Sequence, residues 1–238
     1  MKRSLVVAFC LALGACAEHG FDPIAALSSS SGDGVQQLDD ASTSQLYLSV
    51  VNGLLEQRRY RAALAYLDQY AVKEKKTPHF HRLHGEALLG TERYEDAIAA
   101  FSALERTNLE PDGLNGIGRV KAAQNDWPAA VHYFERAVAL RPASAEFLNN
   151  LGYARLVAGG GNVAEAEFNL RQAQELDPAS VSIRNNLLIA FMLAGKDAEA
   201  QRLLSGIQAS RERTETQNFA TDWVRQYSEA ADAAKEEM

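Results

Sequence analysis

The sequence predicts an all-α protein in which pairs of helices stack on one another as a solenoid. Five segments of the chain align so that each carries an alanine at the same place, at intervals of 34, 33, 36 and 34 residues. These alanines are Ala63, Ala97, Ala130, Ala166 and Ala200. A larger apolar residue stands four positions after each: Leu67, Phe101, Phe134, Leu170 and Leu204. Residues at i and i+4 share one face of a helix, so each segment predicts a helix that buries this pair.

A second helical segment precedes each aligned alanine, most clearly at residues 114–124, 147–157 and 183–193. Gly85, Gly118 and Gly152 stand inside the upstream segments, 12 to 14 residues before their alanines. A glycine within a helix costs about 1 kcal/mol relative to alanine. We therefore expect a neighbouring helix to approach closely at each of these glycines.

Turn and capping residues separate the expected helices. Gly90, Gly159–Gly161 and Gly195 stand where the first helix of a pair should end in a left-handed residue. Asn162 and Glu165 have the spacing of an N-cap and its capping partner. Three prolines agree with this division: Pro128 in a first helical turn, and Pro142 and Pro178 after helices.

These features resemble the tetratricopeptide repeat, a unit of 34 residues with two antiparallel helices. The third unit carries the resemblance best, through Leu114, Ile117, Gly118, Ala130, Phe134, Ala137 and Pro142. The resemblance covers residues 44–210 and implies a right-handed α-solenoid of about five helix pairs. Residues 211–238 are expected to form a C-terminal capping helix and tail, because a solenoid needs its last apolar face covered.

An aromatic stripe marks this C-terminal segment, with Phe219, Trp223 and Tyr227 at i, i+4 and i+8. Such a stripe can be a binding face or part of the core. We favour the core, because the terminal helix must bury an apolar face against the last repeat.

The N-terminus has the parts of an export signal: basic Lys2 and Arg3, an apolar stretch over residues 4–13, and small residues after it. The stretch is shorter than the ~20 residues that span a bilayer, so residues 1–15 are expected to be a removable signal peptide. Residues 13–16, Leu-Gly-Ala-Cys, resemble the bacterial lipoprotein lipobox. That resemblance implies that Cys16 becomes the first residue, carries acyl chains such as palmitate, and anchors the protein in the outer membrane. The alternative is ordinary cleavage after Ala17, which would release a soluble periplasmic protein.

Residues 16–43 are expected to form the lipidated cysteine and a flexible tether, since they include four consecutive serines and no sustained apolar period. Removal of residues 1–15 takes away two bases and no acid, so the net charge changes from −7 to −9. An acidic surface repels phosphate backbones, which argues against a nucleic-acid partner. Cys10 and Cys16 are the only cysteines, so the mature chain cannot close an internal disulfide.

The sequence contains no convincing catalytic motif: it has no glycine-rich phosphate loop, nucleophile elbow or H-E-x-x-H pattern. We therefore expect no enzymatic activity, no cofactor and no small-molecule substrate. His79, His81 and His84 are the nearest approach to a metal site. Only His81 and His84 come near to sharing a helical face, so metal binding remains the weaker alternative.

In tetratricopeptide solenoids the first helix of each pair lines the concave groove. Transferred to this sequence, the groove-facing positions predict seven partner-binding residues: Arg82, Glu86, Asn115, Arg119, Asn149, Tyr153 and Asn185. An asparagine amide donates and accepts hydrogen bonds, so such residues can hold an extended peptide by its backbone. The neighbouring Asn150 and Asn186 fit a groove role and a packing role equally well.

The lipobox, spacer and paired asparagine helices resemble the tetratricopeptide lipoproteins of tight-adherence (Flp) pilus loci. The resemblance implies a pilotin-like scaffold that binds an envelope protein, such as a secretin, during pilus or secretion-system assembly. Other envelope-assembly lipoproteins with these repeats, including pilotins of type IV pili, are close alternatives. A soluble periplasmic metal-binding protein is a third, weaker hypothesis.

Overall fold

The computed structural model describes residues 40–159 and 162–236. Residues 42–238 form one compact unit, to which the following description refers. The predictions for the signal peptide, Cys16 and most of the tether fall on residues 1–39 and lie outside the described residues. Within the described ranges the secondary structure is entirely helical, and no helix there is long and apolar enough to cross a membrane.

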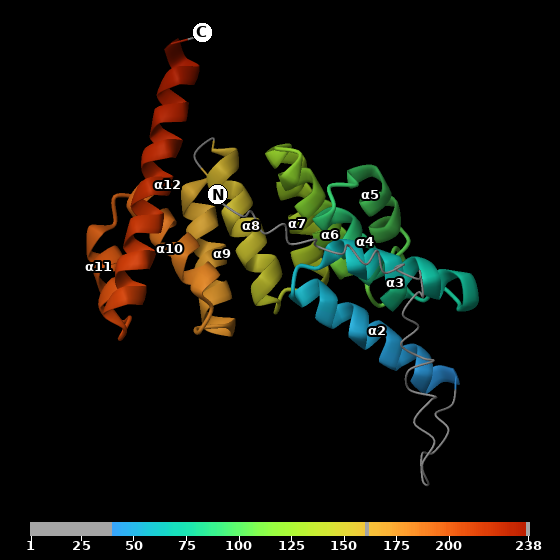
Figure 1. The fold of residues 1–238 in the computed structure, drawn as a ribbon. Helices are drawn as coiled ribbons and strands as arrows, with labels where there is room; N and C mark the ends of the chain where they lie inside the picture. Colours follow the sequence, from blue (N-terminus) through green and yellow to red (C-terminus); the bar gives the residue numbers. More distant parts are fainter. Residues whose placement is uncertain (1–39, 160–161, 237–238) are drawn as a thin grey trace, which may run out of the picture. The chain divides into compact units, whose positions relative to one another are not determined.

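The predicted all-α solenoid of five helix pairs and a terminal helix is confirmed (Figure 1). The pairs are α2 (Asp40–Glu56) with α3 (Tyr60–Lys73), α4 (Pro78–Gly90) with α5 (Tyr94–Ser102), α6 (Glu110–Ala123) with α7 (Trp127–Leu140), α8 (Ala145–Ala158) with α9 (Val163–Leu176), and α10 (Val181–Leu193) with α11 (Asp197–Ser205). The terminal helix is α12 (Ser210–Glu236), whose last turns extend past the other helices in Figure 1.

The first helices of successive pairs form a continuous row. Helix α4 contacts α6, α6 contacts α8, and α8 contacts α10. No such contact joins α5 to α7, α7 to α9, or α9 to α11 in the described part of the chain. The row of first helices is therefore the more closely packed side of the stack, toward which the solenoid curves. We call the exposed side of α4, α6, α8 and α10 the inner face.

The aligned alanines lie in the core, as predicted. Ala63, Ala97, Ala130 and Ala166 are fully buried and Ala200 is nearly so, as are the larger residues four positions after them. The upstream glycines face these larger side chains: a methyl group added to Gly85 would lie 2.6 Å from the ring of Phe101. This is the close helix approach that the glycines predicted.

Polar side chains define the starts of the first helices. Thr77 accepts a hydrogen bond from the N–H of Phe80 at the start of α4, and Ser144 and Ser180 cap α8 and α10 in the same way. Each such cap satisfies one backbone donor that the helix cannot satisfy itself and contributes about 1 kcal/mol. The caps help to hold the inner-face helices in place.

Two predicted turn details are wrong. Gly90 is the last residue of α4, and the left-handed residue is Glu92, with a φ of 62°. Gly90 is required for space, because a β-carbon there would lie 2.3 Å from the ring of Tyr60. Asn162 makes no side-chain cap on α9, because its Nδ2 group donates backwards to the carbonyl oxygen of Gly159 at 2.9 Å.

Candidate protein-binding surface

The seven predicted groove residues all lie on first helices. Arg82 and Glu86 are on α4, Asn115 and Arg119 on α6, Asn149 and Tyr153 on α8, and Asn185 on α10. The side chains do not share one environment: some remain accessible on the inner face, and others hold the helices together. Their contacts separate the two groups.

Glu86 and Arg119 join α4 to α6 across the inner face. The Nη1 group of Arg119 donates to Oε1 of Glu86 at 2.6 Å, and these side chains are 36% and 24% exposed, respectively. A partly exposed ion pair contributes about 0–1 kcal/mol, so this pair can exchange for contacts with a partner at small cost. Arg82 lies half-buried on α4 and makes no ion pair or side-chain hydrogen bond within the described residues. This end of the inner face therefore presents two cations and one carboxylate.

Asn115 is a structural residue rather than an exposed one. Its side chain is buried, its Nδ2 group donates to Oε1 of Glu146 at 2.9 Å, and its Oδ1 accepts from Nδ2 of Asn150 at 2.9 Å. Both ends of the amide are thus used to join α6 to α8. The predicted role of Asn115 in peptide binding has no accessible group to support it.

The same connection recurs one repeat further along. Nδ2 of Asn186 on α10 donates to Oδ1 of Asn149 on α8 at 2.9 Å. Asn150 and Asn186, which fitted either role, thus pack between helices. Asn149 is half-buried and its Nδ2 group makes no hydrogen bond within the described residues, so it keeps one donor for a partner. The repeated Asn-Asn doublets were the sequence signal for these inter-repeat bonds.

Asn185 ends this series, and its side chain has no hydrogen-bond partner among the described residues. Its Oδ1 is buried and accepts no hydrogen bond, and Nε of its neighbour Arg184 is likewise buried without an acceptor. Arg184 instead forms an ion pair through Nη2 with Glu212 of α12. The terminal helix therefore lies beside the inner face at α10.

Tyr153 joins this terminal helix to α8. The indole Nε1 of Trp223 donates to the hydroxyl of Tyr153 at 3.3 Å, and the two ring centroids are 6.3 Å apart. Trp127 meets the other edge of Tyr153 with centroids 5.9 Å apart, and Tyr227 stacks on Trp223 at 5.2 Å. These four rings, from α7, α8 and α12, form an aromatic cluster that joins the terminal helix to α8.

The three residues of the predicted aromatic stripe differ in burial. Trp223 and Tyr227 are half-buried in the aromatic cluster, whereas Phe219 is 47% exposed. Ile189, on the inner side of α10, is fully buried in the cluster of apolar residues that includes Trp223. The accessible part of the inner face therefore extends from α4 to α8. Sequence reasoning missed Trp127, which is the first residue of the second helix α7 and carries no groove signature.

The three histidines of α4 do not form a convergent group of possible metal ligands. His79 is exposed, whereas His81 and His84 flank the ring of Phe80 with centroids 5.5 and 5.3 Å away. No group of three potential metal ligands converges among the described residues. Burial lowers the pKa of all three histidines, as do the charges of Arg82 at His79 and Lys76 at His81.

Comparisons with known proteins identify the repeat. Residues 51–111 and 115–167 match the family described as tetratricopeptide repeat. The TPR repeat-containing protein PA4299 of Pseudomonas aeruginosa is 29% identical over 211 residues, covering 87% of this chain and 80% of that protein.

Solved structures agree in fold. TTC0263, a TPR protein of Thermus thermophilus, has a TM-score of 0.61 at 18% identity, covering 74% of this chain and 98% of its own. YrrB, described as a TPR protein with an unusual peptide-binding site, has a TM-score of 0.50 at 20% identity, covering 75% and 90%. Since the core alanines, the helix pairs and these comparisons agree, this chain is similar to tetratricopeptide-repeat proteins over residues 51–111 and 115–167 and folds as a solenoid of the tetratricopeptide type.

Proposed function

We propose that this protein is an outer-membrane-anchored scaffold that binds a partner protein of the cell envelope during pilus or secretion-system assembly, in the manner of a pilotin. The observation that carries the binding role is the accessible inner face from α4 to α8. It combines the unpaired Arg82, the exchangeable Glu86–Arg119 pair and the free amide donor of Asn149. Arginine is over-represented among residues that dominate binding energy.

The chemistry of this face suits an extended or helical segment with carboxylates and backbone carbonyls. Both arginines can donate two parallel hydrogen bonds to a carboxylate, and Asn149 can donate to a main-chain oxygen. The solved structure of YrrB is described as having a peptide-binding site, which supports peptide recognition as a use of this fold. A secretin is the first partner to test, because the pilus lipoproteins that the sequence resembles imply one.

The binding experiment uses Arg82→Ala/Arg119→Ala, because Tyr153 also supports α12 and its replacement would disturb the fold. Each lost arginine contact should weaken partner binding by about 1–3 kcal/mol. Capture of envelope proteins by crosslinking should therefore fall in this variant. Arg136→Ala/Arg202→Ala is the matched control, since it removes the same charge from exposed positions on the second helices α7 and α11. Undiminished capture of the same partners by the double variant would show that the inner face is not the binding surface.

The anchoring part of the proposal rests on the lipobox at residues 13–16. The Cys16→Ala protein should take up no labelled palmitate, and globomycin should block maturation of the unaltered protein. A Cys16→Ala protein that matures to the same size without lipid would instead support cleavage after Ala17 and a soluble periplasmic protein. The choice between a tight-adherence pilus and another envelope system is decided by the neighbouring genes and by the identity of the captured partner.

A further inference from the structure

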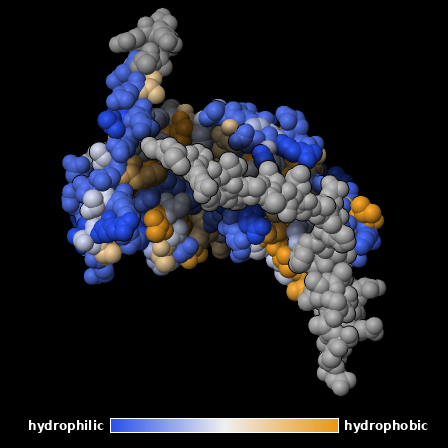
Figure 2. Space-filling model, in the orientation of Figure 1, coloured by the Kyte–Doolittle hydropathy of each residue, from blue (hydrophilic) through white to orange (hydrophobic). Residues whose placement is uncertain are grey.

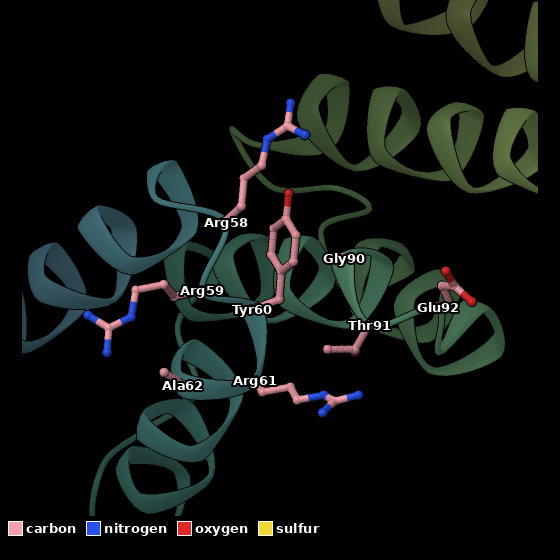
Figure 3. Close-up of a pocket in the computed structure, with 8 residues that line it drawn as sticks. All are labelled: Arg58, Arg59, Tyr60, Arg61, Ala62, Gly90, Thr91 and Glu92. Atoms are coloured by element: carbon pink, nitrogen blue, oxygen red, sulfur yellow. The ribbon is translucent and has the colours of Figure 1, made fainter.

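The turn between α2 and α3 carries three arginines within four residues, Arg58, Arg59 and Arg61. Together with the equivalent turn of the next repeat, between α4 and α5, it surrounds a hollow of about 570 Å³. The lining residues are Arg58, Arg59, Tyr60, Arg61 and Ala62 from one turn and Gly90, Thr91 and Glu92 from the other (Figure 3). We call this surface the arginine turn.

The three arginines have no partner within residues 40–159 and 162–236. Of the sixteen arginines in the described residues, eleven make an ion pair, a side-chain hydrogen bond or a ring contact. The remaining five are Arg58, Arg59, Arg61, Arg82 and Arg202. Three of these five thus stand in one turn of a chain whose net charge is −7. Like charges gathered in one place repel one another, and none of these three forms an ion pair within the described residues, so the grouping does not stabilise the folded protein.

The repeat does not require arginines at these positions. Arg58 is the left-handed residue of its turn, with a φ of 56°, and the equivalent residues of other repeats are Glu92, Asn125 and Gly195. At the positions of Arg59 and Arg61, the third repeat has Asp126 and Pro128. The same turn geometry therefore forms with acidic, neutral or no side chains. Arg93 and Lys196 stand at the position of Arg59 in the second and fifth repeats, but three arginines gather only at this turn of the repeats, and this grouping calls for an explanation outside the fold.

The side chains fan out rather than converge. Figure 3 shows Arg58 extending alongside Tyr60, Arg59 pointing toward another side of the turn, and Arg61 running below Thr91. One small anion cannot contact three guanidinium groups arranged in this way. An extended ligand with several negative groups can, because its charges are spaced along a chain.

We propose that the arginine turn docks an acidic segment of a partner polypeptide, one that carries several aspartate or glutamate side chains. The planar guanidinium group binds a carboxylate through two parallel hydrogen bonds, and its charge is fixed at every physiological pH. Three neighbouring positive charges on an otherwise acidic protein also attract a negatively charged partner surface as the two proteins approach each other. This surface is separate from the inner face, so the two sites are tested independently.

The surroundings favour a polypeptide over an anionic membrane. None of the exposed large apolar residues of the described chain lines the hollow, so nothing there can insert among acyl chains. On the face that Figure 2 shows, the surface that is not drawn in grey is mainly hydrophilic, with separate apolar areas.

The test measures binding of fluorescent hexaglutamate to the purified full-length protein by anisotropy, with hexaglutamine as the neutral peptide. The variant is Arg58→Gln/Arg59→Gln/Arg61→Gln. The control, Arg106→Gln/Arg202→Gln/Arg211→Gln, removes the same charge from exposed sites: the side chains of Arg106 and Arg211 are 90% exposed, and Arg202 is unpaired. Vesicles of phosphatidylglycerol and of phosphatidylcholine are tested in parallel. Circular dichroism checks that all variants keep their helical content.

We expect hexaglutamate to bind, hexaglutamine not to bind, and affinity to fall as NaCl is raised. The arginine-turn variant should bind at least about tenfold more weakly, while the control variant stays near the unaltered protein. Equal losses in both variants would overturn the proposal in favour of net charge alone. Absence of hexaglutamate binding would also overturn it, and arginine-dependent binding only to phosphatidylglycerol vesicles would assign the turn to a membrane instead.

Discussion

Gly118 on α6 lies directly against the ring of Phe134 on α7. A β-carbon at Gly118 would be 2.6 Å from Cε1 of Phe134, which is closer than two carbon atoms can approach. Gly152 has the same relation to Leu170 in the next repeat, at 2.6 Å from its Cγ. The glycine of the first helix and the large apolar residue of the second thus set the distance between the helices of a pair.

This relationship predicts that Gly118→Ala destabilises the protein. The added methyl group must displace Phe134 inside a packed core, at a cost of about 1–3 kcal/mol in the free energy of unfolding. Gly53→Ala on α2 is the matched control, because nothing lies within 4 Å of a β-carbon at that position. There the substitution should stabilise by about 0.5–1 kcal/mol through helix propensity. Urea unfolding of both variants measures the difference, and equal effects would contradict the role assigned to Gly118.

The asparagine contacts predict a stability effect at Asn115. Asn115→Ala leaves Glu146 and Asn150 without their shared partner between α6 and α8, and should lower the free energy of unfolding by about 1–3 kcal/mol. Asn218→Ala, at an exposed position of α12, should change it by less than about 0.5 kcal/mol. Thermal unfolding followed by circular dichroism compares the two. A fully stable Asn115→Ala protein would show that these bonds do not hold adjacent repeats together.

Tyr153 offers an optical test of how α12 is docked. Trp127 and Trp223 are the only tryptophans of the chain, and both contact Tyr153. Tyr153→Ala should expose both indoles, shift their fluorescence emission to longer wavelength and cost about 1–3 kcal/mol of stability. Tyr66→Ala, which removes a ring packed on Tyr47 instead, should leave the emission unchanged. An unshifted spectrum in the Tyr153 variant would argue against the aromatic cluster.

Glu167 predicts a pH-dependent contribution to stability. Its buried carboxylate accepts hydrogen bonds from Lys196 at 2.8 and 3.0 Å and from Arg171 at 2.9 Å. Burial acts to raise the pKa of Glu167, but the bonds and charges of these two cations outweigh it and hold the pKa below its ordinary value. Because the pKa of Glu167 is lower in the folded protein than in the unfolded chain, this carboxylate is protonated at a higher pH when the chain is unfolded. The stabilisation is therefore present near neutral pH and is lost progressively as the pH falls from about 5 through the lowered pKa of Glu167.

The test of this contribution is Glu167→Gln. At pH 7 the variant should be less stable than the unaltered protein by about 1–3 kcal/mol, because two cations lose a charged acceptor. At pH 3 to 4 the difference in the free energy of unfolding between the two proteins should shrink. A difference that stays constant over this range would show that the charge of Glu167 is not the stabilising element.

The sequence by itself determined the repeating core of this protein. The periodic alanines and their apolar partners lie in every unit and depend only on helical periodicity, so they predicted the helix pairs, the buried face and the terminal helix before any contact was known. Pro128 lies in the first turn of α7, as predicted, because the missing N–H group of a proline affects only the local backbone of that turn. The predictions for Gly90 and Asn162 were wrong. The ring of Tyr60 leaves no room for a side chain at position 90, and the side chain of Asn162 donates to the carbonyl oxygen of Gly159 instead of capping α9.

Only the tertiary structure decided what the polar side chains do. Asn115 and Asn149 have equivalent positions in the repeat, yet one is buried with both ends of its amide bonded and the other keeps a free donor. Tyr153 and Trp223 are seventy positions apart in the sequence, so no local sequence pattern predicts their contact. Helical periodicity assigns a residue to a face, but its accessibility depends on which distant helix covers that face, and this follows from three-dimensional packing.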